Sequence, residues 1–383
     1  MSVTSPAGFR AAGVTAGLKD SGSPDLAAVV NDGPGSAAAA VFTSNRCKAN
    51  PVMWSQHMIS GGTARAVVLN SGGANCYTGA AGYSLVEATA ARAAQELNTT
   101  VEQIQICSTG LIGSLFSRDA VLAGTSAAMA ALTRDGGDAA AGAILTTDSH
   151  AKQAEVEGDG YRLGAMAKGA GMLAPALATM LVVVTTDADL GAAELDSALR
   201  AATAQTFDRL DSDGCQSTND TVLLMSSGAS AVAPPLADFT ARLTDVCRDL
   251  ALQLLADAEG AEHDIAITVV GAASQDDALD VARSVARSNL FKCAIFGRDP
   301  NWGRILASVG TTAAVFDPAN LDVALNGVWV CRNSGPGDPP ENVDLTARDV
   351  TVEIDLKSGS RQATVWTNDL THAYVHENSA YST

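Results

Sequence analysis

The chain has 383 residues, with 42 Asp and Glu against 24 Lys and Arg, and a formal net charge of −18. This acidity disfavours nucleic acids and anionic membranes as partners, because Lys and Arg clusters bind both. With 47% hydrophobic and 17% charged residues, the composition is typical of globular protein, and the length is enough for two domains.

Segments that would direct the chain to a membrane or out of the cell are not evident in the sequence. No apolar run reaches the roughly 18 residues of a membrane span, and the N-terminus lacks the basic and apolar pattern of a secretory signal. The seven cysteines are widely spaced and form no CxxC pair. We therefore expect reduced thiols in a cytoplasmic protein, and neither a disulfide framework nor a zinc site.

Hydrophobic periodicity predicts both helices and strands along the chain. Helices are expected at residues 83–97, 118–134, 192–208, 236–258 and 276–288. Strands are expected at residues 66–69, 104–107, 180–184, 265–270 and 350–356, the last alternating as a half-exposed antiparallel strand would. Because the elements follow no strict βαβ rhythm, the pattern favours layered α/β architecture with mixed or antiparallel sheets over a doubly wound parallel fold.

The segment at residues 166–184, MAKGAGMLAPALATMLVVV, places Thr179 immediately before a predicted buried strand. A threonine hydroxyl is a poor nucleophile unless a base lies beside it. If the bond between Ala178 and Thr179 broke, the new α-amine could serve as that base, since its ordinary pKa is near 8. The same residues are also compatible with an ordinary loop that leads into a strand.

This segment resembles the self-cleavage signature of the ornithine acetyltransferase family, in which Lys-Gly-x-Gly-Met, a Pro and Ala-Thr-Met-Leu surround the cut. The resemblance extends along nearly the whole chain, in order. It is carried by GFRAAGVTAGLK at 8–19, NSGGAN at 70–75, STGLIG at 108–113, TTDSHAK at 146–152, STNDT at 217–221, GRDPNWGRILASVG at 297–310 and the terminal ENSAYST.

The resemblance implies a cleavage site and three catalytic residues. The chain would cut itself between Ala178 and Thr179, and Thr179 would then be both the nucleophile and a new N-terminus. Thr109 and Gly110 would form the oxyanion hole, which stabilises the tetrahedral intermediate through hydrogen bonds. A strand that runs into Ser-Thr-Gly can present a hydroxyl and a backbone amide together, although most such tripeptides are plain turns.

The resemblance also assigns substrate binding to Thr146, Lys168, Thr179, Glu259, Asn378 and Thr383. The Lys168 ammonium suits an α-carboxylate, and Glu259 would face the substrate's amino group. Thr147 lies beside Thr146, and the sequence does not decide which of the two threonines contacts substrate. Asn378 and Thr383 would reach the site from the C-terminal hexapeptide.

The fold that the resemblance implies is a layered αββα sandwich of the self-cleaving kind. Residues 1–178 would become one chain and residues 179–383 the other, and the two would stay associated, with a heterotetramer as the family's assembly. The reaction would move acetyl from N2-acetylornithine to glutamate through acetyl-Thr179, in arginine biosynthesis, with no metal and no organic cofactor. Family members differ in whether acetyl-CoA also serves as donor, and no residue here decides it.

Two segments depart from the family pattern. In DAEGAEH, His263 replaces a usual lysine, and in DGCQSTND the residues Cys215 and Gln216 are substituted. These changes leave the predicted nucleophile and oxyanion hole intact. His372 and His376 would share one face only in a helix, whereas their neighbours favour strand or loop, so no histidine metal site is predicted.

Two other functions are compatible with the same residues. A self-processing aminopeptidase or amidase of similar fold would release its acyl group to water, so glutamate would not accelerate deacylation. A catalytically dead amino-acid-binding protein would bind ornithine as an intact chain without turnover.

Overall fold

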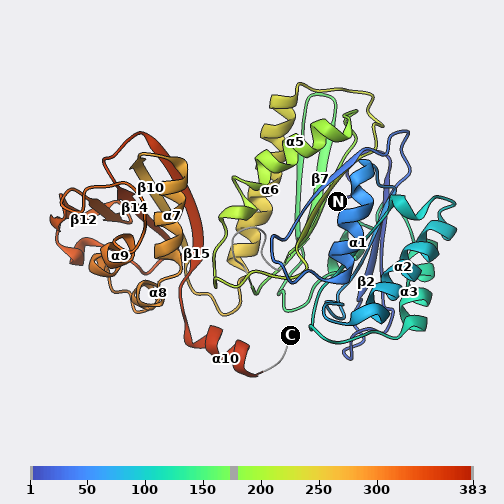
Figure 1. Cartoon of the computed structure of the whole chain (residues 1–383), viewed down its shortest axis with the longest axis horizontal. Coiled ribbons are helices and arrows are strands. Elements are labelled where there is room, and N and C mark those ends of the chain that lie inside the picture. Colours follow the sequence, from blue (N-terminus) through green and yellow to red (C-terminus); the bar gives the residue numbers. More distant parts are fainter. Residues whose placement is uncertain (1–2, 173–179, 381–383) are drawn as a thin grey trace.

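The computed structural model describes residues 3–172 and 180–380, and these form three β-sheets with helices packed on them (Figure 1). The predicted helices and strands are present within these ranges, most of them with ends displaced by a few residues. Ala178, Thr179 and Thr383 lie outside the described residues.

The first sheet has four strands in the order β1-β2-β4-β5. These strands are β1 (Phe9–Val14), β2 (Leu26–Asn31), β4 (Ala66–Asn70) and β5 (Ile104–Ser108). Neighbours β4 and β5 are parallel, and the other neighbours are antiparallel. The sheet is therefore mixed, as the sequence predicted.

The second sheet has five strands in the order β3-β9-β8-β7-β6. They are β3 (Ala38–Phe42), β9 (Thr221–Ser226), β8 (Leu181–Thr186), β7 (Arg162–Lys168) and β6 (Lys152–Glu157). Strand β8 is the apolar run predicted after Thr179, and all six of its residues are buried because layers cover both faces of the sheet. It pairs in parallel with β9 and antiparallel with β7.

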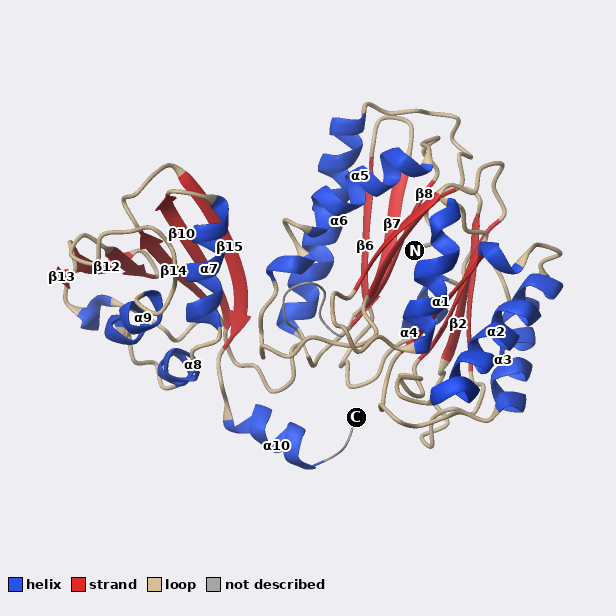
Figure 2. Cartoon of the chain, in the orientation of Figure 1, coloured by secondary structure: helices blue, strands red, loops and turns tan. Residues whose placement is uncertain are grey.

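These two sheets pack face to face and carry helices on their outer sides (Figure 2). Phe9, Val29, Leu69, Met166 and Val183 belong to the apolar core between the sheets. The helices α5 (Ala192–Thr203) and α6 (Leu236–Ala256) pack on the five-stranded sheet. The four-stranded sheet is covered by α1 (Asn50–Met58), α2 (Gly79–Glu96) and α3 (Arg118–Ala130), while α4 (Gly137–Ala143) contributes to the core between the sheets. The predicted αββα sandwich is confirmed.

A third sheet of six strands, in the order β13-β12-β11-β14-β10-β15, has a core of its own. Its strands are β10 (Asp264–Ala272), β11 (Asp322–Leu325), β12 (Val328–Arg332), β13 (Gly335–Pro336), β14 (Asp349–Asp355) and β15 (Arg361–Asn368). The helices beside it are α7 (Gln275–Ala286), α8 (Asn289–Phe296) and α9 (Trp302–Val309). The half-exposed alternation predicted for β14 is present, but the strand is parallel to β10 and antiparallel only to β11.

The last helix, α10 (His372–Ala380), runs from the end of β15 back toward the sandwich (Figure 1). Its start is fixed at the Gly260 loop, because the Thr371 hydroxyl donates to the Gly260 carbonyl and accepts from the Tyr374 N–H. Gly260 has a φ of 64°, and a β-carbon there would lie 2.2 Å from the Tyr374 nitrogen, so only glycine fits. The prediction that residues 372–376 form strand or loop was wrong.

Candidate active site

One cavity brings together every predicted site residue that the structure describes. It is lined by Thr109, Gly110, Thr146, Thr147, Lys168, Gly171, Met172, Glu259 and Asn378. These residues come from segments that follow β5, α4 and α6, from the end of β7, and from α10. Residues far apart in sequence thus meet at one place, close to where β8 begins after the predicted cleavage site.

Thr109 and Gly110 both line this cavity. Thr109 is 1% exposed, and its backbone N–H donates to the Asn70 carbonyl at 3.0 Å. The donor that Thr109 offers is therefore its hydroxyl, whose oxygen accepts a hydrogen bond from Lys168 Nζ at 3.3 Å. Gly110 has a φ of 123°, and a β-carbon there would lie 2.8 Å from Gly73 backbone atoms, so this turn requires glycine.

Lys168 is the last residue of β7, and its ammonium is buried beside a carboxylate that sequence analysis missed. Asp148 Oδ2 lies 3.9 Å from Lys168 Nζ, and Asp148 Oδ1 lies 2.7 Å from Lys152 Nζ. Lys152 also pairs with Asp257. These two lysines and two aspartates form a network in which both lysine side chains and Asp148 are almost completely buried.

The charges in this network change the pKa values of its members. Burial alone would raise the pKa of Asp148, but the Lys168 and Lys152 charges and the hydrogen bonds from Lys152 and the Gly169 N–H lower it to about 2. Burial lowers the pKa of Lys168, and the Asp148 charge opposes this effect. Asp148 thus helps to keep an ammonium in a dry site, where it can bind a carboxylate.

Thr146 and Thr147 make different hydrogen bonds. Thr147 donates its hydroxyl to Glu259 Oε1 at 2.8 Å, whereas the Thr146 backbone N–H donates to Asp148 Oδ2 at 3.0 Å. Both line the cavity, so the choice between them as substrate contact stays open. A β-carbon at Gly171 would lie 2.8 Å from each Glu259 carboxylate oxygen, so the loop after β7 approaches this carboxylate closely.

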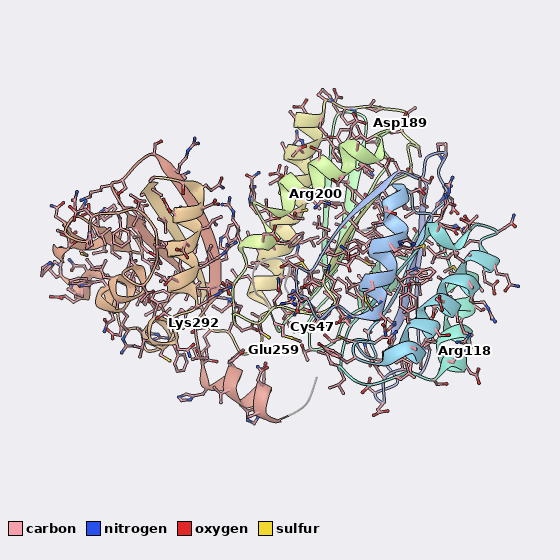
Figure 3. The ribbon with its side chains drawn as sticks, in the orientation of Figure 1. Cys47, Arg118, Asp189, Arg200, Glu259 and Lys292 are labelled. Carbon is pink, nitrogen blue, oxygen red and sulfur yellow. The ribbon has the colours of Figure 1, made fainter. Side chains whose placement is uncertain are left out.

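Glu259 follows α6 and also lines a second cavity of about 180 Å³. The other walls of this cavity include Ser212–Gly214, Lys292 on α8 and Tyr374 on α10. Figure 3 shows Glu259 between α6 and α10, with Lys292 on the side of the six-stranded sheet. Glu259 therefore lines two cavities, one of which is also lined by Thr109 and Gly110.

The residues that depart from the family pattern lie away from the cavity of the oxyanion pair. His263 is 3% exposed, with Nδ1 at 2.7 Å from Asp369 Oδ2 and Nε2 at 3.2 Å from the Leu345 carbonyl oxygen. Gln216 donates to the Ser44 hydroxyl, and Cys215 is exposed. None of the three lines that cavity.

Comparison with known proteins gives the family. The model of the ArgJ family matches residues 10–383. The chain belongs to the ArgJ family. It is 62% identical over 383 residues to the arginine biosynthesis bifunctional protein ArgJ of Thermobifida fusca and 58% identical over 382 residues to that of Streptomyces coelicolor, with 100% of each chain covered.

A solved ornithine acetyltransferase from Mycobacterium tuberculosis, complexed with ornithine, is also similar to this ArgJ-family chain. The identity is 48%, the TM-score is 0.45, and the match covers 47% of this chain and 96% of that chain. Family membership confirms the predicted enzyme class, an acetyltransferase of arginine biosynthesis.

Three further expectations concern the whole chain. All seven cysteines lie in the described residues, and each is a free thiol. No helix within residues 3–172 and 180–380 is long and apolar enough to cross a membrane. In the same part of the chain, no three His, Cys, Asp or Glu side chains are placed to hold a metal ion.

Proposed function

We propose that this chain cuts itself between Ala178 and Thr179 and then transfers acetyl from N2-acetyl-L-ornithine to L-glutamate through an acetyl ester on Thr179. The observation that supports this proposal is the convergence of Thr109, Gly110 and Lys168 on one cavity beside the start of β8. Strand β8 begins two residues after Thr179. We therefore expect Thr179, which lies outside the described residues, to reach the cavity that Thr109 and Gly110 line.

The first half-reaction follows from the roles of these residues. The Thr179 hydroxyl attacks the acetyl carbonyl of acetylornithine, and the Thr179 α-amine takes the hydroxyl proton. The Thr109 hydroxyl and the Gly110 N–H stabilise the oxyanion, since Lys168 donates to the Thr109 oxygen and leaves the hydroxyl proton available. Ornithine departs with the proton from the Thr179 α-ammonium, and acetyl-Thr179 remains.

The second half-reaction uses the same groups in reverse. The glutamate amine attacks the ester carbonyl, the same donors stabilise the oxyanion, and N-acetylglutamate leaves as Thr179 regains its hydroxyl proton. Lys168 binds the α-carboxylate that ornithine and glutamate share, and Glu259 faces the substrate amine. Thr146, Asn378 and Thr383 complete the proposed substrate-binding set.

The five-stranded sheet supports the proposed division into residues 1–178 and 179–383. Its strands β3, β6 and β7 would belong to the first chain, and β8 and β9 would belong to the second. The two chains would therefore share strand pairs at two places, β3 with β9 and β7 with β8, which would keep them associated after cleavage. We propose that two copies of each chain form a heterotetramer in the cytoplasm, as the family resemblance implies.

Intact-mass spectrometry of the purified protein beside a Thr179→Ala variant tests self-cleavage. We expect two fragments divided between Ala178 and Thr179 in the wild type and one uncut chain in the variant. A wild type that stays whole would contradict the mechanism and favour an amino-acid-binding protein.

For the cleaved enzyme, glutamate should accelerate loss of the acetyl group and yield N-acetylglutamate. Acetate release that is indifferent to glutamate would indicate an amidase instead.

A further inference from the structure

The segment Ser217–Thr221 carries two buried polar residues that the proposed chemistry does not use. Asn219 is 4% exposed and Asp220 is 0% exposed, and they stand immediately before β9. Strands β8 and β9 run parallel with Leu181 opposite Thr221, so Asp220 lies opposite Met180. The question is what a completely buried carboxyl does at this position.

One oxygen of Asp220 is bonded to the peptide group next to the proposed nucleophile. The Met180 N–H donates to Asp220 Oδ1 at 3.0 Å, and the Thr221 N–H donates to the Met180 carbonyl at 3.2 Å. Because Met180 directly follows Thr179, the first of these bonds holds the peptide link between the proposed nucleophile and the sheet. This carboxyl therefore anchors Met180, the residue that follows the proposed nucleophile, to the start of β9.

The other oxygen, Asp220 Oδ2, is buried and has no hydrogen-bond partner among the described residues. Burial raises the pKa of Asp220 well above its ordinary value, and the Met180 N–H, the Ser217 hydroxyl and the Lys168 charge lower it by less. A buried polar atom without a partner destabilises a fold, so its presence requires an explanation.

Asn219 ties the same segment to the other half of the site. Its side-chain amide donates to the Ser108 carbonyl at 2.8 Å and to the Ala74 carbonyl at 2.7 Å. Ser108 immediately precedes Thr109, the proposed oxyanion donor. Asp220, at the start of β9, is thus bonded to Met180, which follows the proposed nucleophile. Asn219, beside it, is bonded to Ser108, which precedes the proposed oxyanion donor.

We propose that Asn219 and Asp220 are positioning residues that set the distance between the Thr179 nucleophile and the Thr109 oxyanion donor, with Asp220 Oδ1 accepting the hydrogen bond from the Met180 N–H. This inference rests on the proposed function of Thr179 and Thr109. Attack on a carbonyl requires the nucleophile and the oxyanion donors at a fixed separation, and a displacement of about 1 Å can lower a rate about a hundredfold. Asn219 and Asp220 set the separation between the proposed nucleophile and oxyanion donor from one segment, immediately before β9.

The variants Asp220→Asn and Asp220→Ala separate positioning from mere burial. Asparagine keeps an acceptor for the Met180 N–H, so we expect self-cleavage and kcat within about threefold of wild type. Alanine removes the acceptor, so we expect self-cleavage and kcat to fall about tenfold to a hundredfold with KM for acetylornithine little changed. Asn219→Ala should act in the same direction.

Asp187→Ala is the matched control. Asp187 follows the opposite end of β8, is 6% exposed, and accepts backbone N–H bonds from Ala7 at 3.0 Å and Arg162 at 2.7 Å. Its removal should lower the melting temperature as Asp220→Ala does, while self-cleavage and kcat stay at the wild-type level. This comparison separates a loss of stability from a loss of site geometry.

The inference would be overturned by either of two results. One is an Asp220→Ala protein that cleaves and turns over like wild type. The other is an Asp220→Asn protein that folds but is as slow as the alanine variant, because an acceptor at this position would then be insufficient. The proposed function is tested separately, since wild-type cleavage and glutamate-dependent transfer do not depend on how these variants behave.

Discussion

Replacing Asp148 with Asn tests whether the buried charge network supports both the fold and the substrate site. The substitution preserves shape but leaves the Lys168 and Lys152 ammonium groups without their shared carboxylate. The network lowers the pKa of Asp148 from 3.8 to about 2, a shift of nearly two units. At about 1.4 kcal/mol per unit, Asp148 contributes about 2 kcal/mol to the free energy of unfolding at pH 7.

The sign of the pH dependence follows from the direction of the shift. A carboxyl whose folded-state pKa is depressed stabilises the fold fully above its unfolded pKa, near 4, and that stability is lost as pH falls toward 2. Urea unfolding of wild type and Asp148→Asn should therefore differ by about 2 kcal/mol at pH 7 and by about half of that at pH 3. A difference that is constant between pH 7 and pH 3 would refute the reasoning.

The same substitution should weaken substrate binding. Burial already lowers the pKa of Lys168, and the Asp148 charge opposes that effect, so the variant should lose the Lys168 proton at a lower pH than wild type. We expect KM for acetylornithine to begin to rise at a lower pH in the variant than in wild type. A variant KM that follows the wild-type profile would show that Asp148 acts on stability alone.

Two further substitutions test the cavity. Glu259→Gln preserves an acceptor for Thr147 but removes the negative charge. KM for acetylornithine in steady-state kinetics should therefore rise about tenfold or more. An unchanged KM would exclude Glu259 as the contact of the substrate amine. Gly110→Ala would place a β-carbon 2.8 Å from Gly73 in a turn with positive φ, and should abolish most self-cleavage as judged by intact mass. Gly113→Ala is its control, since Gly113 also has positive φ but open space around it, and should cost only about 1 kcal/mol in thermal unfolding.

Hydrophobic patterns predicted the helices and strands of the sandwich well, because each pattern reflects which faces of the element are covered by a neighbouring layer. The apolar run at β8 is buried on both faces, as a run without alternation requires. Val86, Ala90 and Ala93 are spaced for one helix face, and all three are in the core beneath α2. The α10 helix was missed because its start depends on the distant Gly260 loop and not on its own residues.

The site residues became predictable only through whole-chain resemblance, because single polar residues carry little local signal. Asp148 stands in the TTDSHAK motif, but its pairing with Lys168 requires β7 to end beside it, which spacing does not reveal. Asn219 and Asp220 stand in the STNDT motif, and that motif was their only signal. Their bonds to Ser108 and Met180 depend on the order of strands in two sheets.

The division of the five-stranded sheet between the two proposed chains would make refolding of the cleaved protein depend on its concentration. Before cleavage, the chain holds strands β7 and β8 at an effective concentration on the order of millimolar, and refolding is a first-order process. After cleavage, an unfolded molecule must find its other half by diffusion, so recovery becomes second order and slows with dilution. The time for which the cleaved enzyme stays active would then depend on its unfolding rate and not on its free energy of unfolding.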